Sequence, residues 1–134
     1  MPRPPKCRRV EQLPEFTFFK PAGIPRAKLP EIQLTVEELE AVRLRDLEEL
    51  DYEECAKKMS VSRPTFHRVI MAARKKIAEA LVRGSALRVT GGNFSLAKHE
   101  LACRICGHRW EDIICCRSTR CPLCQANDWQ KVEN

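Results

Sequence analysis

The sequence predicts a mainly α-helical fold, consisting of a helix-turn-helix domain with short flanking strands and a small four-cysteine module after it. Two observations lead to this fold class. Apolar residues recur at helical spacing between residues 35 and 83, and two Cys-x-x-Cys pairs lie 14 residues apart near the end of the chain. With 134 residues, of which 43% are hydrophobic, the chain has room for one small domain and one stapled mini-domain. The predicted segments are an arm (1–30), a helix-turn-helix domain (31–92), a linker (93–100) and a cysteine domain (101–134).

The predicted arm, residues 1–30, is basic and rich in proline. Seven of the nine prolines lie there, which excludes a helix, and residues 15–19 predict one short strand. The segment carries a net charge of +5. We therefore expect Arg3, Arg8 and Arg9 to contact phosphates or a minor groove of DNA, and a disordered solubilising tail is the alternative.

Three helices are predicted between residues 35 and 83. Thr35 and Glu38 form a capping box before the first helix, and a second short helix fits residues 52–59. The third helix fits residues 63–83 and ends at Gly84, a typical C-cap. Six apolar residues of the third helix share one helical spacing and are expected to face the core. These are Phe66, Val69, Ile70, Ala73, Ile77 and Leu81.

The second and third helices have the pattern of a DNA-binding helix-turn-helix. Ala56 is small enough for close helix packing, Ser60 and Val61 form a tight turn, and Ser62 is a good N-cap for the next helix. In such a motif the second helix enters the major groove. The alternative is a helical hairpin whose basic face is only solvated.

The outward face of the third helix supplies the predicted DNA contacts. Arginine bonds the O6 and N7 atoms of guanine, so Arg63 and Arg68 are expected to read bases. The cluster at 74–76 is expected to contact phosphates. The predicted DNA-binding residues of this helix and its cap are Ser62, Arg63, Thr65, His67, Arg68, Met71, Arg74, Lys75 and Lys76.

Six segments of the sequence, taken together, resemble uncharacterised-protein family 0251, also called domain of unknown function family 134. They are residues 1–4, 19–23, 39–44, 62–66, 73–76 and 91–92. The resemblance covers residues 1–92 and implies a DNA-binding protein of bacteria or archaea, without naming an operator or ligand. The helical part also resembles region four of bacterial sigma factors. The sequence departs from the family at Glu49 and Ser60, where glycine is usual, and at Cys55, where alanine is usual.

The cysteine pairs Cys103/Cys106 and Cys121/Cys124 have the spacing of a tetrahedral metal site. We expect one Zn²⁺ per chain in a zinc-ribbon-like domain. Iron, as in rubredoxin, is not separated from zinc by spacing alone. A redox dithiol is a less favoured alternative. The roles of Cys115 and Cys116 are left open by the sequence.

The predicted function is that of a DNA-binding protein, a transcriptional regulator acting on double-stranded DNA. The net charge of +6 agrees with a polyanionic partner. The rival functions are a protein-interaction adaptor, for example one that docks on RNA polymerase, and a rubredoxin-like or metallochaperone protein. No enzyme is expected, because no nucleophile–base constellation or phosphate loop is visible. We further expect a cytoplasmic protein with no membrane span, and a homodimer as the default for this motif.

Overall fold

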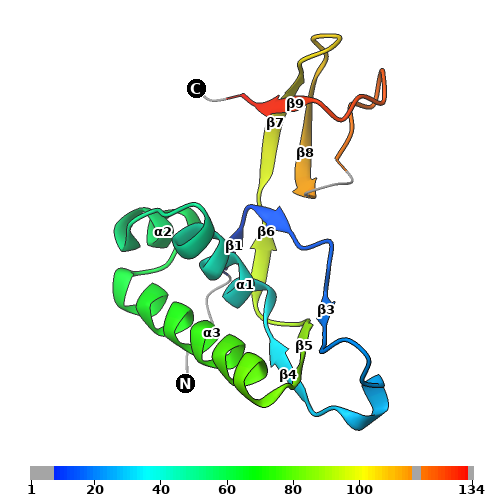
Figure 1. Ribbon diagram of the computed structural model, residues 1–134. Coiled ribbons are helices and arrows are strands. Elements are labelled where there is room, and N and C mark those ends of the chain that lie inside the picture. The colour runs from blue at the N-terminus through cyan, green and yellow to red at the C-terminus, as the bar shows by residue number, and fades with distance from the viewer. Residues whose placement is uncertain (1–7, 116–118, 133–134) are drawn as a thin grey trace. The chain divides into compact units, whose positions relative to one another are not determined.

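The computed structural model describes residues 8–115 and 119–132 (Figure 1). These residues form two compact units. The first, called the helical unit below, comprises residues 8–10 and 16–95. The second, called the cysteine unit, comprises residues 11–15 and 96–132. The chain therefore enters the cysteine unit twice, once for a five-residue segment and once for the remainder.

The described helices all lie in the helical unit, and the expected caps Thr35, Ser62 and Gly84 are present. Helix α1 (Val36–Val42) begins with the Thr35–Glu38 capping box and continues into the π-helical turn η2 (Arg43–Leu47). Helix α2 (Tyr52–Met59) is capped by Asp51, and α3 (Arg63–Arg83) is capped by Ser62. Gly84 ends α3 in the left-handed conformation. A short 3₁₀ turn, η1 (Arg26–Lys28), precedes them.

An apolar core joins the three helices of this unit. Ala56 and Met59 of α2 pack with Ala41 of α1 and with Phe66 and Ile70 of α3. Phe66, Ile70 and Met59 are fully buried. Val61, in the turn between α2 and α3, packs on the same cluster. Burying side chains of this size stabilises the fold by about 1.5–3 kcal/mol each, so the unit has an ordinary hydrophobic core.

The inward stripe predicted for α3 is correct only over the first part of the helix. Phe66, Val69, Ile70 and Ala73 are buried, whereas Leu81 is 78% exposed. Ile77 is half-buried, and Ala80 near the end of the helix is buried at 3% exposed, so the buried face continues but does not include Leu81. Periodicity alone does not show where such a face ends.

The prediction of a mainly α-helical fold is wrong. Within the described residues there are three α-helices, but also nine strands in three sheets. The strands are β1 (Arg8–Val10), β2 (Gln12–Leu13), β3 (Phe18–Phe19), β4 (Glu31–Leu34), β5 (Ala86–Val89), β6 (Phe94–Leu96), β7 (Lys98–Cys103), β8 (Arg109–Cys115) and β9 (Trp129–Lys131). Most are too short to show an alternating pattern, and partners far along the chain supply their hydrogen bonds.

The parallel pairing of β4 with β5 in the helical unit shows why local sequence patterns did not predict the strand at 31–34. Strand β5, which directly follows α3, lies between β3 and β4. It pairs in parallel with β4, from Glu31 beside Ala86 to Leu34 beside Val89. These partners are separated by 55 residues, so no local pattern announces the strand at 31–34. A second pair in the order β1–β6 completes the strands around the helices.

The cysteine unit is a four-stranded sheet in the order β2-β8-β7-β9. The two longest strands, β7 and β8, form an antiparallel pair, and β9 lies antiparallel on the other side of β7. Strand β2 joins β8 in parallel, with Gln12 beside Ile114. Residues 93–100, predicted as a linker, include β6 and the beginning of β7. None of the described helices is long and apolar enough to span a membrane.

Candidate functional site

The four predicted cysteines come together at one end of the cysteine unit. Their sulfurs all lie within 4.8 Å of one another. The Cys103 and Cys124 sulfurs are 3.6 Å apart, as are those of Cys106 and Cys121. Four sulfurs at about 2.3 Å from a tetrahedral zinc ion lie about 3.8 Å from one another. The cluster therefore has the dimensions of a metal site, with two buried and two exposed ligands.

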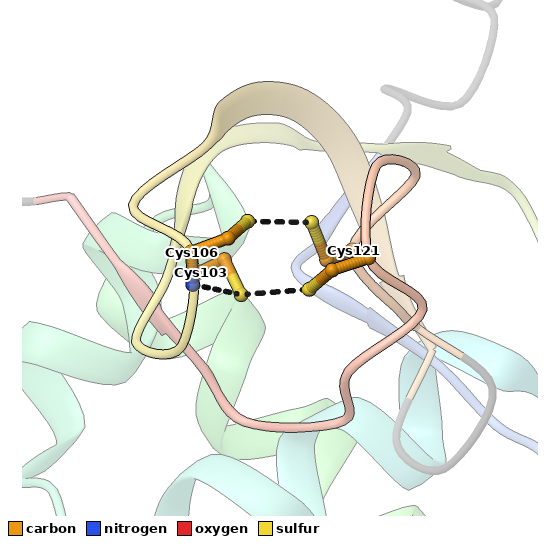
Figure 2. Close-up of side chains that lie close together, drawn as sticks. Cys103, Cys106 and Cys121 are labelled. Carbon is orange, nitrogen blue, oxygen red and sulfur yellow. Dashed lines mark hydrogen bonds between the residues drawn. The ribbon is translucent and has the colours of Figure 1, made fainter.

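Two turns of similar shape place these sulfurs (Figure 2). In the first, the backbone N–H groups of Ile105 and Cys106 each donate to the Cys103 sulfur at 3.4 Å. The turn then reverses at Gly107, which has a φ of 80°. In the second, Gln125 donates its N–H to the Cys121 carbonyl and has a φ of 63°. Amides aimed at sulfur favour the thiolate form, which is the form that binds metal.

The thiols of the cluster differ in acidity. The N–H of Cys106, together with that of Ile105, lowers the pKa of the Cys103 thiol to about 7. The N–H of Ala126 favours the thiolate of Cys124, but desolvation and the neighbouring thiols outweigh it and raise the pKa of Cys124 to about 12. Four thiolates repel one another at this distance. A divalent cation at the centre removes that repulsion, which is why this donor set suits a metal ion.

The turn between α2 and α3 follows from three residues. Ser60 ends α2 in the left-handed conformation, with a φ of 56°. Val61 donates its N–H to the Ala56 carbonyl, and the Ser62 hydroxyl accepts the N–H of Thr65 to begin α3. The departure from glycine at 60 therefore falls on a residue that needs a positive φ, as does the departure at Glu49, with a φ of 60°.

The predicted DNA-contacting residues of α3 and its cap differ in exposure and in their partners. Ser62 is exposed and Thr65 is half-buried. Arg63, His67, Arg68, Met71 and Lys75 are exposed. The other two basic residues already have acidic partners within the helical unit. These are Arg74, which pairs with Asp46 of η2 at 2.6 Å, and Lys76, which pairs with Glu38 of α1 at 2.6 Å.

A hollow of about 490 Å³ lies at the amino-terminal end of α3. Arg63, Pro64, His67 and Arg68 line it together with Tyr52 of α2. The Tyr52 ring meets the His67 ring edge-on at 5.7 Å. Sequence reasoning did not select Tyr52. No sequence signal pointed to it, because Tyr52 lies at the end of α2 farthest from the turn, and only the fold shows its contacts with Phe66 and His67.

The basic arm is described only in part. Arg3 lies outside the described residues. Arg8, in β1, pairs with the buried carboxylate of Glu37 at 2.5 Å, and Arg9 beside it is exposed. The structure therefore brings Arg8 to the helical unit, where it faces the start of α1. Sequence reasoning did not select Glu37 and Glu38, whose carboxylates pair with the predicted DNA contacts Arg8 and Lys76. Their position in the first turn of α1 indicated a helix start and did not reveal that each carboxylate pairs with a cation.

Comparison with known proteins identifies relatives along the whole chain. A family model described as "Protein of unknown function DUF134" matches residues 1–97. A UPF0251 protein of Pelotomaculum thermopropionicum is 64% identical over 133 residues, which cover 99% of this chain and 100% of the relative. A UPF0251 protein of Desulforudis audaxviator is 54% identical over 125 residues, covering 92% and 82% of the two chains. No solved structure matches this chain.

Proposed function

We propose that this chain, which belongs to the DUF134 family of proteins of unknown function, binds duplex DNA and regulates transcription. In this proposal the amino-terminal end of α3 enters the major groove, with α2 across the backbone as in a helix-turn-helix. One observation carries the proposal. The first two turns of α3 bury Phe66, Val69 and Ile70, and the same turns leave Arg63, His67 and Arg68 exposed.

The distribution of charge supports a polyanion as the partner of the helical unit. Residues 1–10 and 16–95 carry 18 basic and 11 acidic side chains, a net charge of +7. Residues 11–15 and 96–134 carry 6 basic and 7 acidic side chains, a net charge of −1. The excess of positive charge thus belongs to the unit that contains α3. Such an excess attracts the phosphate backbone of any sequence and is strongly dependent on salt.

The ion pairs refine the roles that α3 residues take in the proposal. Arg63 pairs with no acidic side chain among the described residues, so its guanidinium is available to a guanine edge. Lys75 is exposed in the same way and suits a phosphate. Arg74 must give up Asp46, and Lys76 must share Glu38, before either contacts DNA. We therefore assign the larger share of binding to Arg63 and Lys75.

Selection of bound sequences from a random duplex pool, followed by anisotropy titrations over a salt series, tests this function. On the selected site, Arg63→Ala should cost about 1–3 kcal/mol, and on scrambled DNA much less. Lys75→Ala should weaken binding to both duplexes and lower the salt slope by about one. Lys28→Ala, which removes an equal charge at η1, is the matched control. Unchanged DNA binding in both α3 variants contradicts the proposal and favours the protein-docking alternative.

The metal of the cysteine unit is proposed to be a single Zn²⁺ that holds a zinc-ribbon-like fold together. Four thiolates without an open position fit a structural rather than a catalytic ion. Iron in the same site would give a coloured protein, as expected for the rubredoxin-like alternative. Elemental analysis of the purified chain separates the two metals, and fewer than about half an equivalent of either contradicts the site. A reducing compartment such as the cytoplasm fits this chemistry, because the thiols must stay reduced to bind metal.

A further inference from the structure

A cavity of about 780 Å³ opens in the helical unit between α1 and α3. We call it the α1–α3 groove and define it by three cationic side chains, Arg8, Arg68 and Lys76, and two hydroxyl side chains, Ser62 and Thr65. Its volume lies within the range of sites that bind small molecules or parts of larger ones. None of its lining residues belongs to the four-cysteine cluster, and all five residues that define it are among the predicted DNA contacts.

Two carboxylates fix two of the cations at the wall of the groove. Glu37 is 3% exposed, and its two oxygens accept the Arg8 guanidinium and the Asn93 N–H. Glu38 is 7% exposed, and one of its oxygens accepts both the Thr35 N–H and the Lys76 ammonium. The carboxylates are thus occupied from within the protein. Arg8 and Lys76 keep further N–H donors, since a guanidinium has five and an ammonium three.

The third cation belongs to the beginning of α3 and contacts the hydroxyl of Thr65. Arg68 donates to the Thr65 hydroxyl at 3.4 Å, and the Ser62 and Thr65 hydroxyls are 2.9 Å apart. Among the described residues, Arg68 pairs with no carboxylate. With three cations against two carboxylates, the lining carries a net charge of +1, and its free hydrogen-bonding groups are mostly donors. An oxyanion with several acceptor oxygens matches such a wall better than a cation or an apolar group.

We propose that the α1–α3 groove binds a phosphate group, which is carried by the DNA backbone or by a free phosphorylated molecule. Arg68 and Lys76 contact its oxygens from α3, Arg8 contacts them from β1, and Thr65 positions Arg68. Arg68 therefore recognises phosphate and not a base edge. The groove also gives the arm residue Arg8 a defined partner. Only the DNA source rests on the proposed function, because a phosphate group can bind the groove in the absence of any duplex.

The test uses the full metal-loaded chain and inorganic phosphate as the probe, at constant ionic strength against chloride. We expect saturable shifts of the Thr65 and Arg68 amide signals in NMR spectra. Arg68→Gln should weaken the apparent affinity by about tenfold or more, because it removes a charge-assisted hydrogen bond. Lys57→Gln, an equal loss of charge on the exposed side of α2, should leave it unchanged. Because Arg68 is exposed, its substitution should not unfold α3, which circular dichroism checks. Thr65→Val, which keeps the N–H bonded to Ser62, is a second and milder variant.

The absence of saturable shifts, or equal shifts in wild type and Arg68→Gln, overturns the proposal. A second series with saturating duplex identifies the source of the phosphate. If DNA supplies it, duplex abolishes the response to inorganic phosphate, and Arg68→Gln weakens binding to selected and scrambled DNA alike. If a free molecule supplies it, the response persists on the DNA-bound protein. Should the chain bind no DNA at all, the titration without duplex still decides the groove, and only the DNA-binding proposal fails.

Discussion

The helical unit and the cysteine unit are held together by different forces. In the helical unit, side chains of three helices bury a shared apolar cluster that includes Phe66, Ile70 and Met59. In the cysteine unit, fewer apolar side chains are buried among the described residues, chiefly Leu101 and Ile114, and two of the buried groups are the ligand sulfurs of Cys103 and Cys121. We infer that one unit folds on its hydrophobic core, whereas in the other the proposed metal ion takes the place of part of such a core.

Of the changes that test this difference between the units, loss of the metal should have the largest effect on folding. Metal binding contributes about 10–16 kcal/mol to the folding of small zinc domains. We therefore expect Cys103→Ser to unfold the cysteine unit and leave the helical content nearly unchanged. Elemental analysis with circular dichroism and NMR measures both. Cys55→Ala is the control, since it removes a cysteine from the helical unit and should keep the metal. Loss of the helices in Cys103→Ser contradicts the independence of the two units.

The converse experiment damages the hydrophobic core. Phe66 of α3 is fully buried in the core of the helical unit, so Phe66→Ala should cost about 3–5 kcal/mol of the free energy of unfolding. Denaturant titrations followed at the helical signal should show this loss. The metal content of the folded protein should stay the same as in wild type. Metal release in Phe66→Ala before any denaturant is added would mean that the cysteine unit depends on the helical core.

Acidification should affect the two units at different pH values. The ligand sulfurs must be thiolates, so protonation releases the metal as the pH falls, and a chromophoric chelator detects it. In the helical unit, hydrogen bonding to Arg74 lowers the pKa of Asp46 below its ordinary 3.8. The stability from this pair is therefore present above 3.8 and is lost as the pH falls through the lowered pKa. We expect metal release at a higher pH than loss of this contribution. Helices that melt before the metal leaves would contradict that order.

The smallest predicted effects concern two turns. Ser60 and Glu49 both have a positive φ without being glycine. Ser60→Gly and Glu49→Gly should each stabilise the helical unit by about 0.5–1 kcal/mol, because glycine adopts this conformation without strain. The reverse change, Gly84→Ala at a φ of 70°, should destabilise it by a similar amount. Thermal unfolding of the three variants checks the signs, and no gain in either glycine variant means that the side chains offset the strain.

Sequence patterns sufficed where the deciding interactions were local. The caps at Thr35, Ser62 and Gly84 were correctly placed from the sequence because each acts within one turn of its helix. The four cysteines were predicted because the spacing within each pair fixes the chemistry of the site. The family resemblance was likewise confirmed by the matching family model.

The rest depended on partners far along the chain. The strand at β4 has its partner at β5, and the β2 segment has its partner at β8, across more than a hundred residues in the latter pair. The same holds for the ion pairs that occupy Arg74 and Lys76, whose carboxylates lie 28 and 38 residues away. Helical periodicity indicates which basic residues share an outward face. Only the fold shows which of their charges already have acidic partners.

Residues 11–15 belong to the cysteine unit but are translated early. The order of translation therefore constrains the order in which the two units fold. Gln12 leaves the ribosome about a hundred residues before its partner Ile114, a delay of roughly 5–20 s at common rates of translation. Residues 16–95, which make up most of the helical unit, are translated in that interval. Its hydrophobic core can therefore form while residues 11–15 are still unpaired, and the pairing of β2 with β8 follows as a later step.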